Sequence, residues 1–138
     1  MSTFNYQAWA LFIVRLLLGA TFMLHGSQKV FGLFGGKGLE SFASSVVAMG
    51  TPKILGYAAA LFEFFGGLLI FLGIATELGA LLTIPVMIGA IVLVHGSHGY
   101  FAQSGGFEYA LNLLILAVVL IIGGPGTAAL WDPFITWR

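Results

Sequence analysis

The sequence predicts an all-α integral membrane protein, in which four transmembrane helices form a bundle and a short amphipathic helix occupies the first connection. The first observation is composition: of 138 residues, 59% are hydrophobic and 7% are charged, whereas a soluble globular domain carries about 25% charged residues. The second is that four apolar runs approach the roughly 20 residues that a membrane helix needs. The third is that glycine and proline separate these runs. A chain of this length is expected to form one domain, residues 1–138.

The same composition excludes several classes of function. The formal net charge is zero, so the chain lacks the basic stripe that a nucleic-acid-binding protein needs. Ten charged side chains would not cover the surface of a water-soluble domain of this size. The absence of cysteine removes disulfide scaffolds, thiolate metal sites and thiol–disulfide redox chemistry.

The apolar runs are expected to cross the membrane in chain order, which places both termini on the same side. They cover residues 9–31, 54–75, 78–95 and 107–122. The first is expected to be a retained helix and not a signal peptide, because no Lys or Arg precedes it. Pro85 lies inside the third run and is expected to kink that helix.

The first connection contains one more predicted helix. Apolar residues recur there at helical spacing, and serines with Glu40 take the other face. The apolar positions are Leu39, Phe42, Ala43, Val46, Val47 and Gly50. This pattern indicates a short amphipathic helix in the membrane interface, either as a cap over the bundle or as a lid.

Most ionisable side chains are expected to converge on the face opposite the termini. That face receives the end of the first and third spans and the start of the second and fourth. Its polar residues are His25, Gln28, Lys29, Lys37, Lys53, His95, His98 and Glu108. The sequence therefore predicts that almost all of the ionisable chemistry lies at one mouth of the bundle.

Two charges lie deeper in the predicted spans. Arg15 precedes His25 by ten residues, and Glu63 lies nine residues into the second span. At 1.5 Å per residue both come to a similar depth, where an unpaired charge would be costly. The sequence therefore predicts that Arg15 and Glu63 pair, either as a structural ion pair or as the polar floor of a cavity.

The histidines and the fourth span leave several kinds of site open. The candidate metal ligands are His25, His95, His98 and Glu108. Two facing histidines could instead ligate a haem, or histidine and glutamate could hold a quinone head group and move its protons. Asn112 follows Glu108 by four residues and is expected to share its helix face.

The chain also resembles a known family. The residues that carry the resemblance are Arg15-Leu-Leu-Leu-Gly19, Phe22-Met-Leu-His25-Gly26-Ser-Gln28-Lys29-Val-Phe31-Gly32, Glu63-Phe-Phe-Gly66-Gly67, Gly105-Gly106-Phe-Glu108-Tyr109-Ala110 and Gly124-Pro125-Gly126. In this order they are similar to the DoxX family. The ending Leu130-Trp131-Asp132 departs from the Ser-Leu-Asp-like close of many relatives.

The resemblance implies a four-span bacterial or archaeal membrane protein. The family takes its name from a membrane thiosulfate:quinone oxidoreductase and its associated terminal quinol oxidase. Some members are partners in oxidative-stress assemblies, and more distant relatives act as membrane chaperones or assembly factors. The family's recurrent polar set falls on Arg15, His25, Gln28, Lys29, Glu63, His95 and Glu108.

Three functional hypotheses follow, all for a protein surrounded by lipid in the cytoplasmic membrane of a prokaryote. The first is a quinone-linked redox protein or oxidoreductase subunit, with quinone as the expected cofactor and haem or a non-haem metal as alternatives. Its electrons would come from a soluble or membrane redox partner, because the chain encodes no electron carrier. Its catalytic residues would be His25, Glu63, His95 and Glu108, and its ligand-binding residues Arg15, Gln28, Lys29, Tyr109 and Asn112.

The second hypothesis is a non-enzymatic structural or assembly subunit of a larger membrane complex. The third is a small-molecule carrier, which with four spans would have to act as an oligomer.

Overall fold

The structure is a computed structural model that describes residues 5–134. Over these residues it is helical apart from an isolated β-bridge between Ile74 and Trp131, which confirms the predicted all-α class. The α-helices are α1 (Tyr6–Val30), α2 (Leu39–Ala48), α3 (Lys53–Leu72), α4 (Thr76–Gly89) and α5 (Glu108–Gly123). Between α4 and α5 lie the π-helical segment η1 (Ala90–His95) and the 3₁₀ segments η2 (Gly96–His98) and η3 (Ala102–Ser104).

Three helical stretches in the described part of the chain are long and apolar enough to cross a membrane. They are Tyr6–Val30, Lys53–Leu72 and Thr76–His98. The apolar helix α5 has 16 residues, or about 24 Å at 1.5 Å per residue, which is less than the roughly 30 Å hydrocarbon core. Length and composition thus support three of the four predicted spans.

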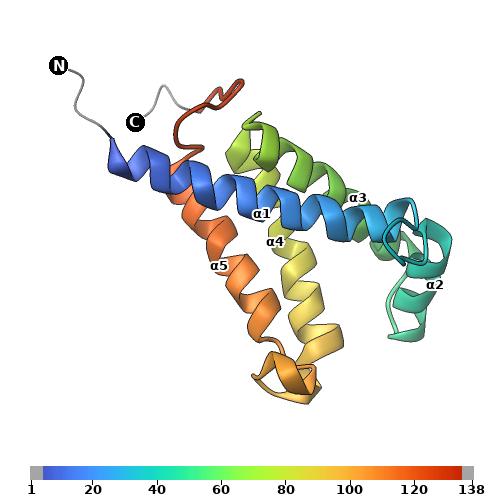
Figure 1. Ribbon diagram of the computed structural model, residues 1–138. Helices are drawn as coiled ribbons and strands as arrows, with labels where there is room; N and C mark the ends of the chain where they lie inside the picture. The colour runs from blue at the N-terminus through green and yellow to red at the C-terminus, as the bar shows by residue number, and fades with distance from the viewer. Residues whose placement is uncertain (1–4, 135–138) are drawn as a thin grey trace.

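The long helices pack as two antiparallel pairs. Figure 1 shows α1 and α3 running alongside each other, whereas α4 and α5 run away from α1 together. The connection between α4 and α5 therefore lies at a different corner of the molecule from α2. The core lies where the pairs meet and includes Leu18, Phe22, Ile70, Ala80, Ala117 and Leu120. The expected four-helix bundle is not confirmed by this arrangement.

Close backbone approaches at glycines set the register of α1 against α3. A Cβ atom on Gly19 would lie 2.5 Å from the backbone nitrogen of Phe71, and one on Gly26 would lie 2.5 Å from the Cα atom of Phe64. Small residues allow membrane helices to approach this closely. Gly19 is therefore level with Phe71, and Gly26 with Phe64, as expected for antiparallel helices. If this register is continued by four residues, Arg15 comes level with about residue 75.

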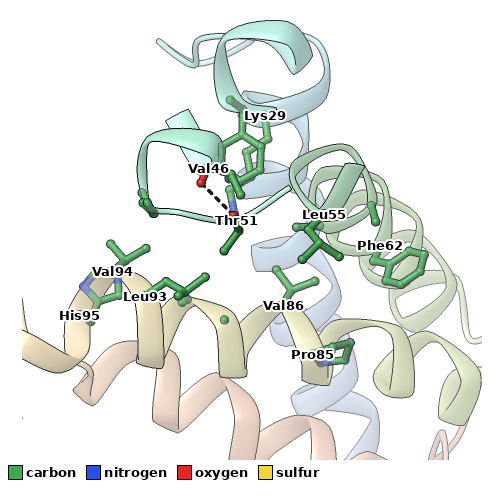
Figure 2. Close-up of a pocket in the computed structure, with 16 residues that line it drawn as sticks. Lys29, Val46, Thr51, Leu55, Phe62, Pro85, Val86, Leu93, Val94 and His95 are labelled. Carbon is green, nitrogen blue, oxygen red and sulfur yellow. Dashed lines mark hydrogen bonds between the residues drawn. The ribbon is translucent and has the colours of Figure 1, made fainter. Parts of the chain in front are cut away.

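The predicted amphipathic helix is confirmed as α2. Its buried residue Ala43 packs against Gly56 near the start of α3, where a Cβ atom would lie 2.6 Å from the Ala43 Cα atom. In the linker, the Thr51 hydroxyl donates a hydrogen bond to the Val46 carbonyl oxygen over 2.8 Å (Figure 2). These contacts place the apolar side of α2 over the first turns of α3.

An exposed polar contact also ties α2 to α3. Lys53 forms an ion pair with Glu40, and the Tyr57 hydroxyl donates to Glu40 Oε2 over 2.5 Å. The hydrogen bond from Lys53, and after it the one from Tyr57, lowers the pKa of Glu40. Because this pKa is lower in the folded chain, the contact contributes stability above the ordinary carboxyl pKa and loses it as the pH falls through the lowered value.

We therefore expect acid to loosen α2 in the wild-type protein more than in Glu40→Gln. The measurement is the protection of α2 amides against hydrogen exchange between neutral and acid pH, corrected for intrinsic exchange rates. Ser44→Ala, a change at another exposed position of α2, is the control and should follow the wild type. An identical pH dependence in the wild type and Glu40→Gln would show that the contact does not hold α2.

The segment that follows α5 packs against the start of α1 and the turn between α3 and α4. The Trp131 N–H donates to the Gly73 carbonyl oxygen over 3.0 Å, and Asp132 Oδ2 accepts from the Thr76 N–H over 3.1 Å at the start of α4. The Thr127 N–H donates to the Ala8 carbonyl oxygen over 3.1 Å. The start of α1 and the end of the described chain therefore lie at the same end of the molecule (Figure 1).

Candidate functional site

A pocket of about 460 Å³ lies between α2, α3 and the α4–η1 segment (Figure 2). Most of its lining is apolar and includes Phe42, Val46, Leu55, Phe62, Val86 and Leu93. Its polar lining residues are Lys29, Thr51 and His95. The volume is in the range of small-molecule sites, which are typically apolar with a few placed polar groups.

The wall opposite α2 owes its shape to an irregular stretch of helix. Pro85 lacks an N–H and interrupts the hydrogen-bond ladder of α4. Gly89 leaves open space, since a Cβ atom there would meet nothing within 4 Å. The helix then continues as the π-helical η1, and such segments occur frequently at functional sites.

Lys29 and Glu63 form an ion pair at the pocket wall. Lys29 Nζ contacts Glu63 Oε2, and the two side chains are 26% and 3% exposed, respectively. The Lys29 ammonium also lies 5.0 Å from the centroid of the Phe42 ring of α2. The pocket thus carries a positive charge on its wall, with the compensating carboxylate buried behind it.

Further polar side chains adjoin this pair on the side of α5. His25 Nδ1 lies 3.2 Å from Gln28 Oε1, and the Tyr109 hydroxyl lies 3.4 Å from His25 Nε2. On α1, Gln28 directly precedes Lys29, and His25 lies about one helical turn before it. We call the set formed by His25, Gln28, Lys29, Glu63 and Tyr109 the polar cluster.

Three other residues predicted for the opposite face, His95, His98 and Glu108, lie at the α4–α5 connection. His95 Nδ1 donates to the Gly105 carbonyl oxygen over 2.7 Å, and Glu108 Oε2 accepts from the Ala102 N–H over 3.0 Å. His98 Nδ1 lies 3.3 Å from the Ser97 hydroxyl oxygen. This connection adjoins the polar cluster, because His95 lines the same pocket as Lys29, and Tyr109, which follows Glu108, contacts His25.

The candidate metal ligands are distributed over these two places. His25 belongs to the polar cluster, whereas His95, His98 and Glu108 belong to the α4–α5 connection. Within residues 5–134, no group of three or more His, Cys, Asp or Glu side chains is placed to hold a metal ion. Asn112 is exposed on α5.

The predicted pairing of Arg15 with Glu63 is wrong. Arg15 is 1% exposed, and its Nη2 donates to the carbonyl oxygens of Thr127 and Ala128 over 3.3 and 3.1 Å. In the α1–α3 register, Glu63 comes level with about residue 27 of α1, so about 12 residues, or roughly 18 Å, separate the two side chains along the axis. The predicted pairing assumed that His25 is level with the start of the second span. In the structure, α3 instead begins beyond the end of α1, where it packs against α2.

Sequence reasoning missed a group of polar residues at the end of the molecule near Arg15. Asp132 attracts the Arg15 guanidinium and caps α4 through Thr76. Glu77 is buried in the first turn of α4. An acidic residue in the first helical turn is a recognisable signal, but the predicted spans 54–75 and 78–95 left Thr76 and Glu77 in the connection between two helices. The turn instead comprises residues 73–75, and Gly73 adopts a left-handed conformation there.

Comparison with known proteins gives two relatives. Over 123 residues, 89% of this chain and 84% of the relative, the sequence is 32% identical to "Putative oxidoreductase CatD" of Bacillus subtilis (strain 168). Over 137 residues, 94% of both chains, it is 27% identical to a protein of Haemophilus influenzae described as "Uncharacterized protein". No solved structure matches the chain.

The family comparison covers the part of the chain that contains α1 to η1. The model of the DoxX family matches residues 10–96. The match includes Lys29, Glu63 and the pocket-lining residue His95, and it ends before α5. The expected resemblance is thus confirmed over more than half of the sequence, and the chain belongs to the DoxX family.

Proposed function

We propose that the protein is the membrane-embedded subunit of an oxidoreductase and that it binds a quinone in the pocket between α2, α3 and η1. The observation that carries this proposal is an apolar pocket bordered by one charged side chain, Lys29, and one imidazole, His95 (Figure 2). A quinone combines an apolar ring and tail with two carbonyl oxygens that need hydrogen-bond donors. The word oxidoreductase in the name of the Bacillus subtilis relative supports the same class of function.

The polar lining residues offer complementary hydrogen bonds. The Lys29 ammonium would donate to a carbonyl oxygen. His95 already donates through Nδ1 to the Gly105 carbonyl oxygen, so neutral His95 keeps Nε2 as an acceptor for a hydroxyl group. When bound, the quinone would supply the ability to carry two electrons and two protons. The apolar walls would exclude water from the head group.

A redox role requires a partner. The chain has no cysteine and no recognisable electron-carrier motif, so electrons would arrive from a second, redox-active subunit.

We further propose that α5 makes a fourth crossing, helped by flanking apolar residues or by local thinning of the bilayer. Both termini would then lie on one side of a prokaryotic cytoplasmic membrane. The shared position of the start of α1 and the end of the described chain supports this topology.

The binding of decylubiquinone to the protein in lipid nanodiscs tests the proposal. We expect Gly89→Phe to weaken binding about tenfold or more, because the new ring enters the pocket from a position with open space around it. Val119→Phe, at an exposed position of α5, is the matched control and should bind like the wild type. No binding by the wild type, or equal binding by Gly89→Phe, would reject the site. A partner subunit that co-purifies in that case would favour the structural-subunit hypothesis.

A further inference from the structure

The pocket lies along the seam between α3 and the antiparallel α4–η1 segment, and close contacts set the register of this seam. A Cβ atom on Gly66 would lie 2.9 Å from the Gly79 carbonyl oxygen and 2.8 Å from Thr83 Cγ2. Residue 66 of α3 is therefore level with about residue 81 of α4. Because the two helices are antiparallel, each step back along α3 corresponds to one step forward along α4.

Three pairs of pocket-lining residues face each other across this seam. The register places Phe62 opposite Pro85, Ala58 opposite Gly89 and Leu55 opposite Leu93. Figure 2 shows the larger side chains of these pairs on facing sides of the pocket. Each side of the seam thus has a large side chain at both ends and only a methyl group or a hydrogen atom in the middle.

Gly89 leaves space at this point and does not bring the helices together. Small residues in membrane helices usually allow close approach, as Gly66 does in the same seam. A Cβ atom on Gly89, by contrast, would meet nothing within 4 Å. Because Ala58 on the facing helix adds only a methyl group, the seam has an opening at its middle.

This opening faces outward from the helix pair. Leu55, Phe62 and Leu93 beside it are 53%, 40% and 44% exposed, respectively. They belong to two of the helical stretches that are long and apolar enough to cross a membrane, so lipid acyl chains would surround the opening. On the inner side of the pocket, Lys29 contacts the buried carboxylate of Glu63. The pocket is therefore polar toward the protein and apolar toward the lipid.

We propose that the opening between Ala58 and Gly89 is a lateral portal, in which the apolar tail of a bound quinone passes from the pocket into the bilayer. This inference rests on the proposed quinone site. The ring lies inside with a carbonyl oxygen toward Lys29, and the tail lies between the two small residues. The ligand class is then a long-tailed quinone that dissolves in lipid, and Ala58 and Gly89 determine the specificity for its tail.

The binding of two quinones to the protein in lipid nanodiscs tests this position of the tail. Decylubiquinone carries a tail, and dimethoxy-methyl-benzoquinone is the same ring without one. We expect Ala58→Leu to weaken decylubiquinone binding about tenfold, because the added carbon atoms occupy the place of the tail. Binding of the tailless ring should stay unchanged. Leu61→Phe enlarges an exposed side chain of α3 outside the pocket lining and is the matched control, which should bind both quinones like the wild type.

Two results of this experiment would overturn the portal. Ala58→Leu could bind decylubiquinone as tightly as the wild type, in which case the tail lies elsewhere. It could also weaken the binding of both quinones equally, in which case the new side chain obstructs the ring and not the tail.

A second measurement uses the wild-type protein and needs no variant to fold. A decylubiquinone analogue with a photoreactive diazirine in its tail is bound, illuminated and located by mass spectrometry. We expect the label on residues 55–62 of α3 and residues 85–93 of the α4–η1 segment. A label confined to residues 49–51 would show that the tail leaves beneath α2, and it would overturn the portal.

The portal and the quinone site fail in distinguishable ways. If decylubiquinone binds the wild type and Gly89→Phe abolishes binding, but Ala58→Leu binds like the wild type, the quinone site stands and the portal is rejected. If neither quinone binds the wild type, the proposed function is rejected and the portal with it.

Discussion

Gly26→Ala is expected to lower the free energy of unfolding by about 3 kcal/mol, because the added methyl group overpacks the contact between α1 and α3. Its Cβ atom would lie 2.5 Å from the Cα atom and 2.6 Å from the backbone nitrogen of Phe64. Neither atom belongs to a side chain that can rotate away. The two helices would have to separate, and the contact between Lys29 and Glu63 lies beside this crossing.

Unfolding of the detergent-solubilised protein by heat or by SDS measures this effect. Gly89→Ala is the matched control, because its Cβ atom would meet nothing within 4 Å. The control is expected to be neutral or to stabilise the helix by about 0.5–1 kcal/mol. Equal stabilities of Gly26→Ala and Gly89→Ala would contradict the close helix contact.

Lys29→Met is expected to destabilise the protein by about 3 kcal/mol, because it leaves the carboxylate of Glu63 buried without its partner. Glu63 is 2% exposed and therefore cannot be solvated where it lies. The double variant Lys29→Met/Glu63→Leu removes both charges and is expected to recover most of the loss. A double-mutant cycle on the same unfolding assay measures the coupling between the two positions.

Arg15 supplies the control for this cycle. Because about 18 Å separate Arg15 from Glu63 along the helix axis, the losses in Arg15→Met and Glu63→Leu should add to within about 0.5 kcal/mol. Strong coupling of Glu63 to Arg15, with none to Lys29, would show that α1 and α3 pack in a different register.

Much of the secondary structure was predictable because local sequence specifies it. Apolar runs, glycines and prolines placed α1, α3, α4 and α5 with end points that differ from the prediction by a few residues. Apolar residues at helical spacing likewise predicted α2. The π-helical η1 was not predicted, since apolar periodicity does not distinguish it from a regular helix.

The site was predictable as a set of residues and not as an arrangement. All five members of the polar cluster were candidates. Glu63 was one because an ionisable group at membrane depth is costly, and His25, Gln28 and Lys29 were candidates because of their place at one end of the predicted spans and their match to the family's polar set. Their partners depended on the relative position of helices that are distant in the chain. The prediction placed α3 about 12 residues away from its actual position along α1. This error paired Glu63 with Arg15, whereas Glu63 contacts Lys29 in the structure.

The sequence by itself determined that this protein is helical and membrane-embedded, that it belongs to one family, and which side chains are candidates for chemistry. These properties follow from composition, from the length of apolar runs and from motifs, all of which are local. Only the tertiary structure decided that Lys29 pairs with Glu63, that Arg15 holds the segment after α5, and that a pocket opens beneath α2. The physical reason is that glycine contacts set the helix register, and the divergence of α4 and α5 from α1 and α3 sets the space between them.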